Sequence, residues 1–353
     1  MINTVGPLVL AFLVAFLGTP LVKKLAIKVK AIDRPDARKV HNGLMPRLGG
    51  LAICLGFWVA ILLTQEPSRE ILGVLLGGLL IVLLGILDDT RGLSPRVKLL
   101  GQVLAACVVL YGGVRVEFLT SPIAGIIDLK YFSYFITVIW IIGVTNAVNL
   151  IDGLDGLAAG VSAIAAVTLG IVSIFEGYQE VAVLAFILAA STLGFLKYNF
   201  HPAKLFMGDT GSMFLGFNLA TIAIIGLTKS ATVISLFLPI VILGIPIADT
   251  FFAIIRRYFN GKPIFSPDKD HLHHRLLALG LSHKHTVLAI YGVSIILGAS
   301  AVLTAMLTTP QGVIVMLITT AGVFMAADKV GVLRGEDFHV KPQDEKAYQN
   351  IAK

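Results

Sequence analysis

The chain has 353 residues, of which 56% are hydrophobic and 14% charged, and its mean hydropathy is +0.88. Soluble domains carry about 25% charged residues, so this composition excludes an ordinary soluble protein and predicts a polytopic membrane protein. The formal net charge of +7 comes without a nucleic-acid-binding motif, so we expect no nucleic-acid partner. Cys54 and Cys107 both fall in apolar runs, which favours free thiols over a disulfide.

Eleven apolar windows, each of about 20 residues, mark candidate membrane-spanning helices. They cover residues 4–23, 48–64, 71–87, 98–114, 132–150, 157–175, 180–198, 212–228, 231–255, 286–307 and 311–327. We therefore predict an all-α polytopic fold with a single transmembrane domain over residues 1–327 and a polar tail over 328–353. The ninth window contains Gly244, Pro246 and the acidic Asp249, a combination that predicts a broken helix.

The distribution of positive charge predicts the orientation. The first window has no Lys or Arg before it, and its positive charges follow it, which is the reverse of a signal peptide. With the N-terminus outside, the cytoplasmic connections and their helix ends carry 24 of the 28 Lys and Arg residues. This bias is the positive-inside signal, so we predict an outside N-terminus and a cytoplasmic C-terminus in a plasma membrane.

Every cluster of polar residues that could take part in binding or catalysis falls on the predicted cytoplasmic side. In chain order, the first is residues 33–47, a basic stretch that ends before Gly49. Topology accounts for most of its positive charge, and Lys39 and Arg47 are candidates for phosphate contacts. The second is Asp88 with Asp89, two adjacent carboxylates that repel each other unless a cation or a proton joins them. Mg²⁺ with phosphate would satisfy this requirement, and a helix-end turn is the alternative.

The third cluster closes the fifth window. Asn146, Asn149, Asp152 and Asp155 follow one another at intervals of three, so neighbouring pairs lie on roughly the same side of a helix. A plain helix end with turn glycines is the alternative. Acids at a helix C-terminus oppose the helix dipole, however, which favours a binding role.

The fourth cluster, residues 206–212, opens the eighth window. Asp209 there can serve as a helix cap, and a helix N-terminus bracketed by glycines also suits phosphate. An acid beside the phosphate suits its metal ion. Phe206 is either an interfacial anchor or a platform for a base.

The fifth cluster, residues 268–275, supplies imidazoles and a guanidinium that can bind diphosphate oxygens. Its candidate ligands are His271, His273, His274 and Arg275. A zinc site is the weaker alternative, because His273 and His274 are adjacent and no cysteine is near. The other alternative is a solvated loop that has no binding role. His283 and His285 continue the run and are predicted to be surface residues.

Taken together, the clusters resemble the polyprenyl-phosphate N-acetylhexosamine-1-phosphate transferase family of glycosyltransferases. The resemblance covers almost the whole chain and rests on four motifs in the family's order. These are Asp88-Asp89, Asn146-x-x-Asn149-x-x-Asp152-Gly153-x-Asp155-Gly156, Met207-Gly208-Asp209-x-Gly211-Ser212 and His271-Leu272-His273-His274-Arg275. It implies a bacterial inner-membrane enzyme with a cytoplasmic active site, in which undecaprenyl phosphate attacks the β-phosphorus of a UDP-sugar and UMP is released. It also implies a requirement for Mg²⁺, with Mn²⁺ as a possible substitute.

The resemblance further implies roles for individual residues. Asp209 would be the principal metal ligand. Asp88 or Asp89 would be the base or the positioning acid for the lipid phosphate, and either could also be a metal ligand. The nucleotide pocket would consist of Asn149, Asp152 and Asp155, with Phe206 stacking on uracil, and Asn146 would be a further substrate-binding residue. The diphosphate or the sugar would be bound by His271, His273, His274 and Arg275.

The last motif indicates the branch of the family. Asp-His-Leu-His-His-Arg stands where the peptidoglycan branch carries Pro-x-His-His-His, and Asp33-Arg34-Pro35-Asp36 fits the branch that uses UDP-N-acetylglucosamine. That branch starts teichoic acid or O-antigen synthesis. The near alternative is a phospho-N-acetylmuramoyl-pentapeptide transferase, and a metal-binding scaffold is a remote one. An ion-coupled transporter would place its acids near mid-span and show paired halves, which we do not find. A homodimer is compatible with the sequence.

Overall fold

The computed structural model describes residues 5–33, 44–121, 125–229, 237–259, 261 and 271–329. Lys39 and residues 330–353 of the predicted tail lie outside this part of the chain. The first helices are α1 (Val5–Lys28), α2 (Gly50–Thr64), α3 (Arg69–Arg91), α4 (Pro95–Tyr111), α5 (Phe132–Leu150) and α6 (Leu157–Phe175). The later ones are α7 (Gln179–Asn199), α8 (Gly208–Lys229), α9 (Phe237–Ile242), α10 (Gly244–Phe259), α11 (Leu272–Ala278), α12 (His283–Met306) and α13 (Thr309–Lys329).

Two small sheets, which hydropathy did not predict, lie in the connections. Strand β1 (Ile32–Asp33) pairs antiparallel with β2 (Met45–Pro46), and β3 (Phe118–Ser121) pairs antiparallel with β4 (Gly125–Asp128). The rest of the described chain is helical or irregular.

The predicted all-α polytopic fold is confirmed. Among the described residues, seven helices are long and apolar enough to cross a membrane, namely α1, α3, α5, α6, α7, α8 and α12. Helices α2 and α13 are shorter apolar helices. Each of the eleven predicted windows coincides with a helix or, in one case, with two. The number of spans and their orientation remain predictions.

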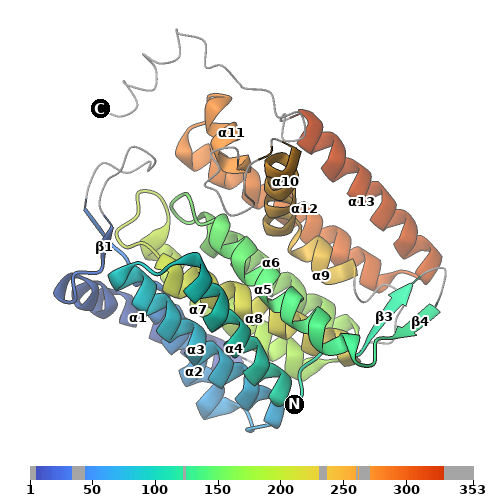
Figure 1. Cartoon of the computed structure of the whole chain (residues 1–353), viewed down its shortest axis with the longest axis horizontal. Coiled ribbons are helices and arrows are strands. Elements are labelled where there is room, and N and C mark those ends of the chain that lie inside the picture. The colour runs from blue at the N-terminus through green and yellow to red at the C-terminus, as the bar shows by residue number, and fades with distance from the viewer. Residues whose placement is uncertain are drawn as a thin grey trace.

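The ninth predicted window is broken, as its sequence indicated. Helix α9 ends at Ile242, Leu243 is a turn residue, and α10 begins at Gly244. Pro246 has no N–H to donate to the preceding turn, which accounts for the interruption. The two helices run in different directions (Figure 1).

Helix α8 lies at the centre of the bundle. It packs against α2, α3, α5, α6 and α7, and 89% of its apolar window is buried, compared with 28% for α1. The leucines of α1 are therefore placed to meet lipid, whereas α8 is surrounded by protein. Polar residues at the N-terminus of α8 consequently lie among the ends of several other helices.

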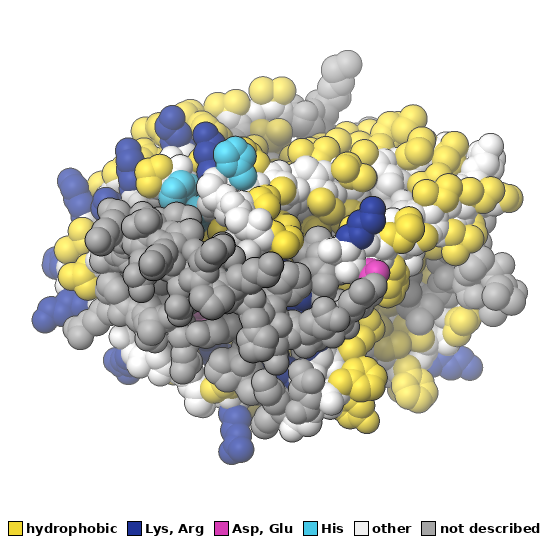
Figure 2. Space-filling view, turned by 90° about the horizontal axis from the view of Figure 1, so that it is seen from above, with side chains coloured by type: hydrophobic (Ala, Val, Ile, Leu, Met, Phe, Trp, Pro, Cys, Tyr) yellow, Lys and Arg dark blue, Asp and Glu magenta, His cyan; other side chains and the backbone are white. Residues whose placement is uncertain are grey.

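The two ends of the bundle differ in character. Helix α11 lies toward one end and the β3–β4 hairpin lies at the other (Figure 1). Viewed from above, most visible Lys and Arg side chains gather on the left of the molecule, and apolar side chains dominate the right (Figure 2).

Candidate active site

The N-terminus of α8 is capped by an acid from α3. Asp89 Oδ1 accepts a hydrogen bond from the Asp209 backbone N–H at 3.0 Å. Its Oδ2 accepts from Thr210 N at 3.0 Å and from Thr210 Oγ1 at 2.6 Å. First-turn N–H groups have no partner within their own helix, and the helix dipole favours a negative charge beside them. Asp89, which is 2% exposed, therefore anchors the start of α8.

Glycines allow α3 and α8 to approach this closely. Gly208 has φ +72°, and a methyl group there would overlap the Asp89 carboxylate. A methyl group on Gly85 would overlap the backbone of Thr210. Side chains at either position would push the two helices apart.

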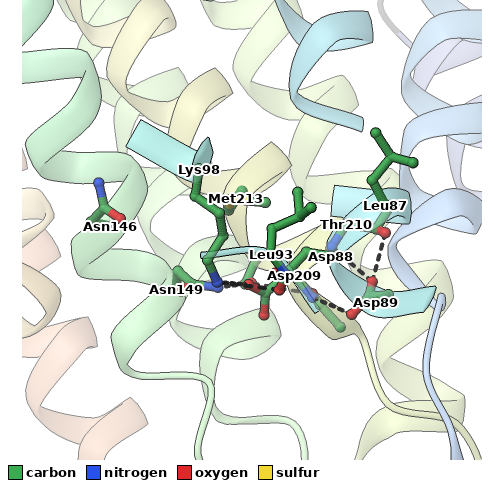
Figure 3. A network of polar contacts seen from close by, with 12 residues as sticks. Leu87, Asp88, Asp89, Leu93, Lys98, Asn146, Asn149, Asp209, Thr210 and Met213 are labelled. Carbon is green, nitrogen blue, oxygen red and sulfur yellow. Dashed lines mark hydrogen bonds and ion pairs between the residues drawn. The ribbon is translucent and has the colours of Figure 1, made fainter. Parts of the chain in front are cut away.

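Asp88 and Asp209 converge on one positive charge. Lys98 Nζ, from α4, donates to Asp209 Oδ2 at 2.7 Å and to Asp88 Oδ2 at 3.2 Å (Figure 3). Asp88 Oδ1 accepts from Leu93 N at 2.7 Å. Two carboxylates from different helices thus lie within reach of a single cation. Sequence reasoning missed Lys98, because a lysine at the end of an apolar window is ordinarily part of the positive-inside pattern.

Arg47, the residue after strand β2, reaches the same region. It forms an isolated bridge with Phe206, and Phe206 N donates to Pro46 O at 2.9 Å. Arg47 Nε donates to the backbone oxygen of Asp89 at 3.0 Å and lies 3.7 Å from Asp89 Oδ1. This pairing also fixes Phe206 beside the N-terminus of α8.

The acidic loop after α5 provides another wall. Asn149 Nδ2 donates to Ser212 Oγ at 2.8 Å, which ties the end of α5 to α8. Burial, with the charges of Asp209, Asp89 and Asp155, raises the pKa of Asp152 to about 8.

Asn146 lies apart from these residues. Its Nδ2 donates to Gln102 Oε1 at 2.7 Å, and its Oδ1 accepts from Gln102 Nε2 at 3.3 Å. This reciprocal amide pair joins α4 to α5, and Asn146 does not line the pocket described next.

A polar pocket of about 390 Å³ joins these elements. Of the predicted site residues, its lining includes Arg47, Asp89, Asp152, Asp155, Phe206, Asp209 and His274. The volume falls within the range of small-molecule sites. A polar hollow of similar volume contains Arg115 and Tyr134, but it lies by the β3–β4 hairpin at the other end of α5. A third hollow, beside α6, α8 and α9, is mostly apolar and has a volume of about 40 Å³.

The histidine motif is held in place by α10. Asp249 Oδ2 lies 2.8 Å from His271 Nδ1, and Asp249 Oδ1 accepts from Leu272 N at 2.8 Å. The structure therefore places the Asp249 carboxylate at the start of α11. His274 lines the pocket, while His271 and Arg275 are each 6% exposed.

His273 packs against the acidic loop. A methyl group on Gly153 would overlap its ring, and its Nε2 is buried without a hydrogen-bond partner in the described structure. Burial, with the charge of His274 as the next cause, lowers the pKa of His273 to about 3, so the imidazole is neutral near pH 7. His273 can therefore donate or accept a hydrogen bond without carrying a charge.

The carboxylates present suit a magnesium ion. Asp88, Asp89 and Asp209 pair with Lys98 and Arg47, the two cations beside them in the described part of the chain. Asp152 lies close enough to Asp209 and Asp89 for their charges to contribute to its raised pKa. Negative charges outnumber positive ones, and a hard divalent cation prefers oxygen ligands. The zinc alternative at the histidine motif gains no support, because its described residues do not bring three candidate ligand atoms together.

Two further histidines reach the pocket. These are His201 and His283, which both line the pocket. His283 was predicted to be a surface residue and is half-buried, whereas His285 is exposed as predicted. Neither His201 nor His283 stands in a recognisable motif, so only the folded arrangement brings them to the site.

Comparison with known proteins agrees with this geometry. The model of glycosyl transferase family 4 matches residues 71–227. The probable undecaprenyl-phosphate N-acetylglucosaminyl 1-phosphate transferase of Bacillus subtilis is 43% identical over 335 residues, which cover 94% of each chain. The decaprenyl-phosphate N-acetylglucosaminephosphotransferase of Mycobacterium leprae is 36% identical over 312 residues, covering 80% of this chain and 78% of that one.

A third relative is the undecaprenyl-phosphate alpha-N-acetylglucosaminyl 1-phosphate transferase of Pasteurella multocida. It is 32% identical over 290 residues, which cover 80% of this chain and 81% of the relative. Similarity over nearly the full length, together with the acidic motifs assembled around one pocket, identifies the chain as a sugar-phosphate transferase. It belongs to the polyprenyl-phosphate N-acetylhexosamine-1-phosphate transferase family, within glycosyl transferase family 4.

Proposed function

We propose that this enzyme transfers N-acetylglucosamine 1-phosphate from UDP-N-acetylglucosamine to undecaprenyl phosphate. An oxygen of the lipid phosphate bonds to the β-phosphorus, the bond from that phosphorus to the bridging oxygen breaks, and UMP leaves. The observation that carries the proposal is the convergence of Asp88 and Asp209 on one cation position beside the pocket. The names of the relatives support the acetylglucosamine donor and the polyprenyl phosphate acceptor.

The donor nucleotide would occupy the side of the pocket formed by the acidic loop. Phe206 lies there with Asp155 and presents a ring on which uracil could stack. Asn149 would act by tying this loop to α8 through Ser212 rather than through the pocket lining.

Asp209 and Asp88 are the residues that would hold Mg²⁺, with Mn²⁺ as a substitute. A bound magnesium ion would supply positive charge to the phosphate oxygens. Asp89 has a different role in this proposal, because its oxygens already accept three hydrogen bonds from the first turn of α8. It positions Asp209.

Basic and neutral donors would orient the phosphates. Lys98 and Arg47 lie on the acidic side of the pocket, and His274 lines it from the histidine motif. Buried and uncharged, His273 would bind by hydrogen bonding through Nε2. His271 and Arg275 are buried and do not line the pocket, so they would stabilise the conformation of the motif.

The location follows from charge. The positive-inside pattern supports an active site at the cytoplasmic leaflet of the bacterial inner membrane, where nucleotide sugars are made. The product, undecaprenyl-diphospho-N-acetylglucosamine, would start a cell-envelope polysaccharide of the teichoic acid or O-antigen type.

Donor selectivity tests the proposal. Detergent-purified protein with undecaprenyl phosphate and Mg²⁺ should release UMP from UDP-N-acetylglucosamine faster than from UDP-N-acetylgalactosamine or the muramoyl-pentapeptide nucleotide. Preference for the muramoyl-pentapeptide nucleotide would overturn the donor assignment and favour the peptidoglycan alternative. No UMP from any donor would overturn the proposed reaction.

A further inference from the structure

A second group of potential metal ligands lies at the edge of the pocket. Asp155, His201 and His283 each offer a ligand atom, and these atoms lie within 4.8 Å of one another. Asp155 comes from the loop between α5 and α6, His201 follows α7, and His283 begins α12. Among the described residues, no other group of three or more His, Cys, Asp or Glu side chains meets this condition.

Hydrogen bonds fix the positions of the three residues relative to one another. His201 Nδ1 lies 2.9 Å from Asp155 Oδ2, which also accepts from Ala203 N at 3.0 Å. His283 Nε2 accepts from the Asp155 backbone N–H at 3.0 Å. Asp155 Oδ1 has no hydrogen-bond partner in the described part of the chain. The three side chains are thus gathered by contacts within the group, and a metal ion bound there would replace the contacts made by the ring nitrogens.

The two rings are also stacked. Their centroids are 4.2 Å apart, with an angle of 22° between the planes. Neutral imidazoles and a carboxylate are ligands of zinc-like ions, and three protein ligands leave a coordination position open.

We propose that Asp155, His201 and His283 form a binding site for a divalent transition metal ion of the zinc class. It differs in chemistry from the magnesium site proposed at Asp88 and Asp209, which offers carboxylate oxygens alone. Magnesium prefers oxygen ligands, whereas zinc binds imidazole readily, so the two sites select different ions.

Occupation of this site has a consequence for the reaction. Asp155 lines the pocket on the side assigned to the donor nucleotide, so a zinc ion bound there competes with the UDP-sugar for that side chain. This consequence rests on the proposed function, whereas metal binding itself does not.

Direct zinc titration tests the site. Full-length protein in detergent, stripped with a chelator and held in excess Mg²⁺, should bind one Zn²⁺ per chain in competition with a zinc indicator. Co²⁺ should give the visible absorption of an ion with nitrogen and oxygen ligands at low coordination number. His283→Gln and His201→Gln should each weaken zinc binding at least about 10-fold. His285→Gln is the matched control, because His285 is exposed on the same first turn of α12 and should keep wild-type affinity.

Two results would overturn the site. One is the absence of stoichiometric zinc binding by the wild type, and the other is unchanged affinity in both histidine variants. The His201 side chain is 39% exposed, so His201→Gln gives a decision even if His283→Gln fails to elute as a single species.

The consequence for the reaction has its own readout. Zinc should raise KM for UDP-N-acetylglucosamine in the wild type and should have less effect on His201→Gln. Zinc binding without a change in KM would refute the competition and leave the metal site standing. Absence of UMP release in zinc-free buffer would instead count against the proposed function.

Discussion

Asp88 and Asp89 are neighbours in sequence with different surroundings. Asp89 is enclosed by the first turn of α8, and Asp88 turns toward Lys98 and Asp209. The sequence indicated that the pair was important but could not assign a separate role to each acid, because the roles depend on which residue faces α8. Lys98 was missed because a lysine at a membrane boundary fits the positive-inside pattern, and its acidic partners lie on other helices.

Substitutions of Asp88 and Asp89 should have different effects on stability and activity. Asp89→Asn replaces an acceptor oxygen with a donor, leaves a first-turn N–H of α8 unpaired, and should cost about 1–3 kcal/mol of unfolding free energy. Asp88→Asn keeps an acceptor for Leu93 N and should unfold closer to the wild type while losing UMP release. Thermal unfolding in detergent and turnover measure the two effects. Equal unfolding of Asp89→Asn and the wild type would contradict the capping role.

Asp152 should make stability depend on pH when magnesium is removed. The unfolded chain loses this proton near pH 3.9, while the folded chain keeps it to about pH 8, so the free energy of unfolding falls as pH rises between these values. Unfolding in EDTA should therefore occur at lower temperature at pH 8 than at pH 6. Asp152→Asn should show a smaller difference, and an identical pH dependence in that variant would contradict the assignment.

At the scale of elements, hydropathy predicted every long helix and the interruption after α9, because these depend on local composition. It could not predict α11 as an ordered helix or the partner of Asp249, which lies 22 residues before His271 in sequence. The two small sheets were also missed, since β1 and β2 are two residues long and lack a periodic pattern. Asn146 shows the same limit, because spacing placed it on a helix while its contact with Gln102 depends on α4.

Asp249 should order the histidine motif. Asp249→Asn offers one acceptor oxygen in place of two, so either the His271 or the Leu272 contact is lost. We expect faster hydrogen exchange over residues 271–279 and about a 10-fold lower kcat/KM for the UDP-sugar, corresponding to a loss near 1.4 kcal/mol. Exchange rates equal to those of the wild type would show that α10 does not hold the motif.

At the scale of the whole molecule, the polar clusters meet at one end of a bundle built around α8. Their common side was predicted from charge alone, and their convergence on one pocket is now visible. The position of the membrane and the identity of each face remain predictions from the positive-inside rule.

Thiol labelling should establish the orientation. In a Cys107→Ser background, where the remaining Cys54 is fully buried, a cysteine replacing Tyr131 should react with a membrane-impermeant reagent in intact cells. A cysteine replacing His285 should react only after the membrane is opened. The reverse pattern would place the pocket on the outer face.

A magnesium-dependent transfer should depend on Asp209 more strongly than on any residue outside the site, and UMP release measures this dependence. Wild-type protein with undecaprenyl phosphate and UDP-N-acetylglucosamine should release UMP with Mg²⁺, stop in EDTA and recover when Mg²⁺ is restored. Asp209→Asn should fall by about 100-fold or more while eluting like the wild type, and Asp128→Asn, on the distant hairpin, should remain active. Full turnover by Asp209→Asn, or UMP release unaffected by EDTA, would contradict the proposed role of Asp209 in a magnesium-dependent transfer.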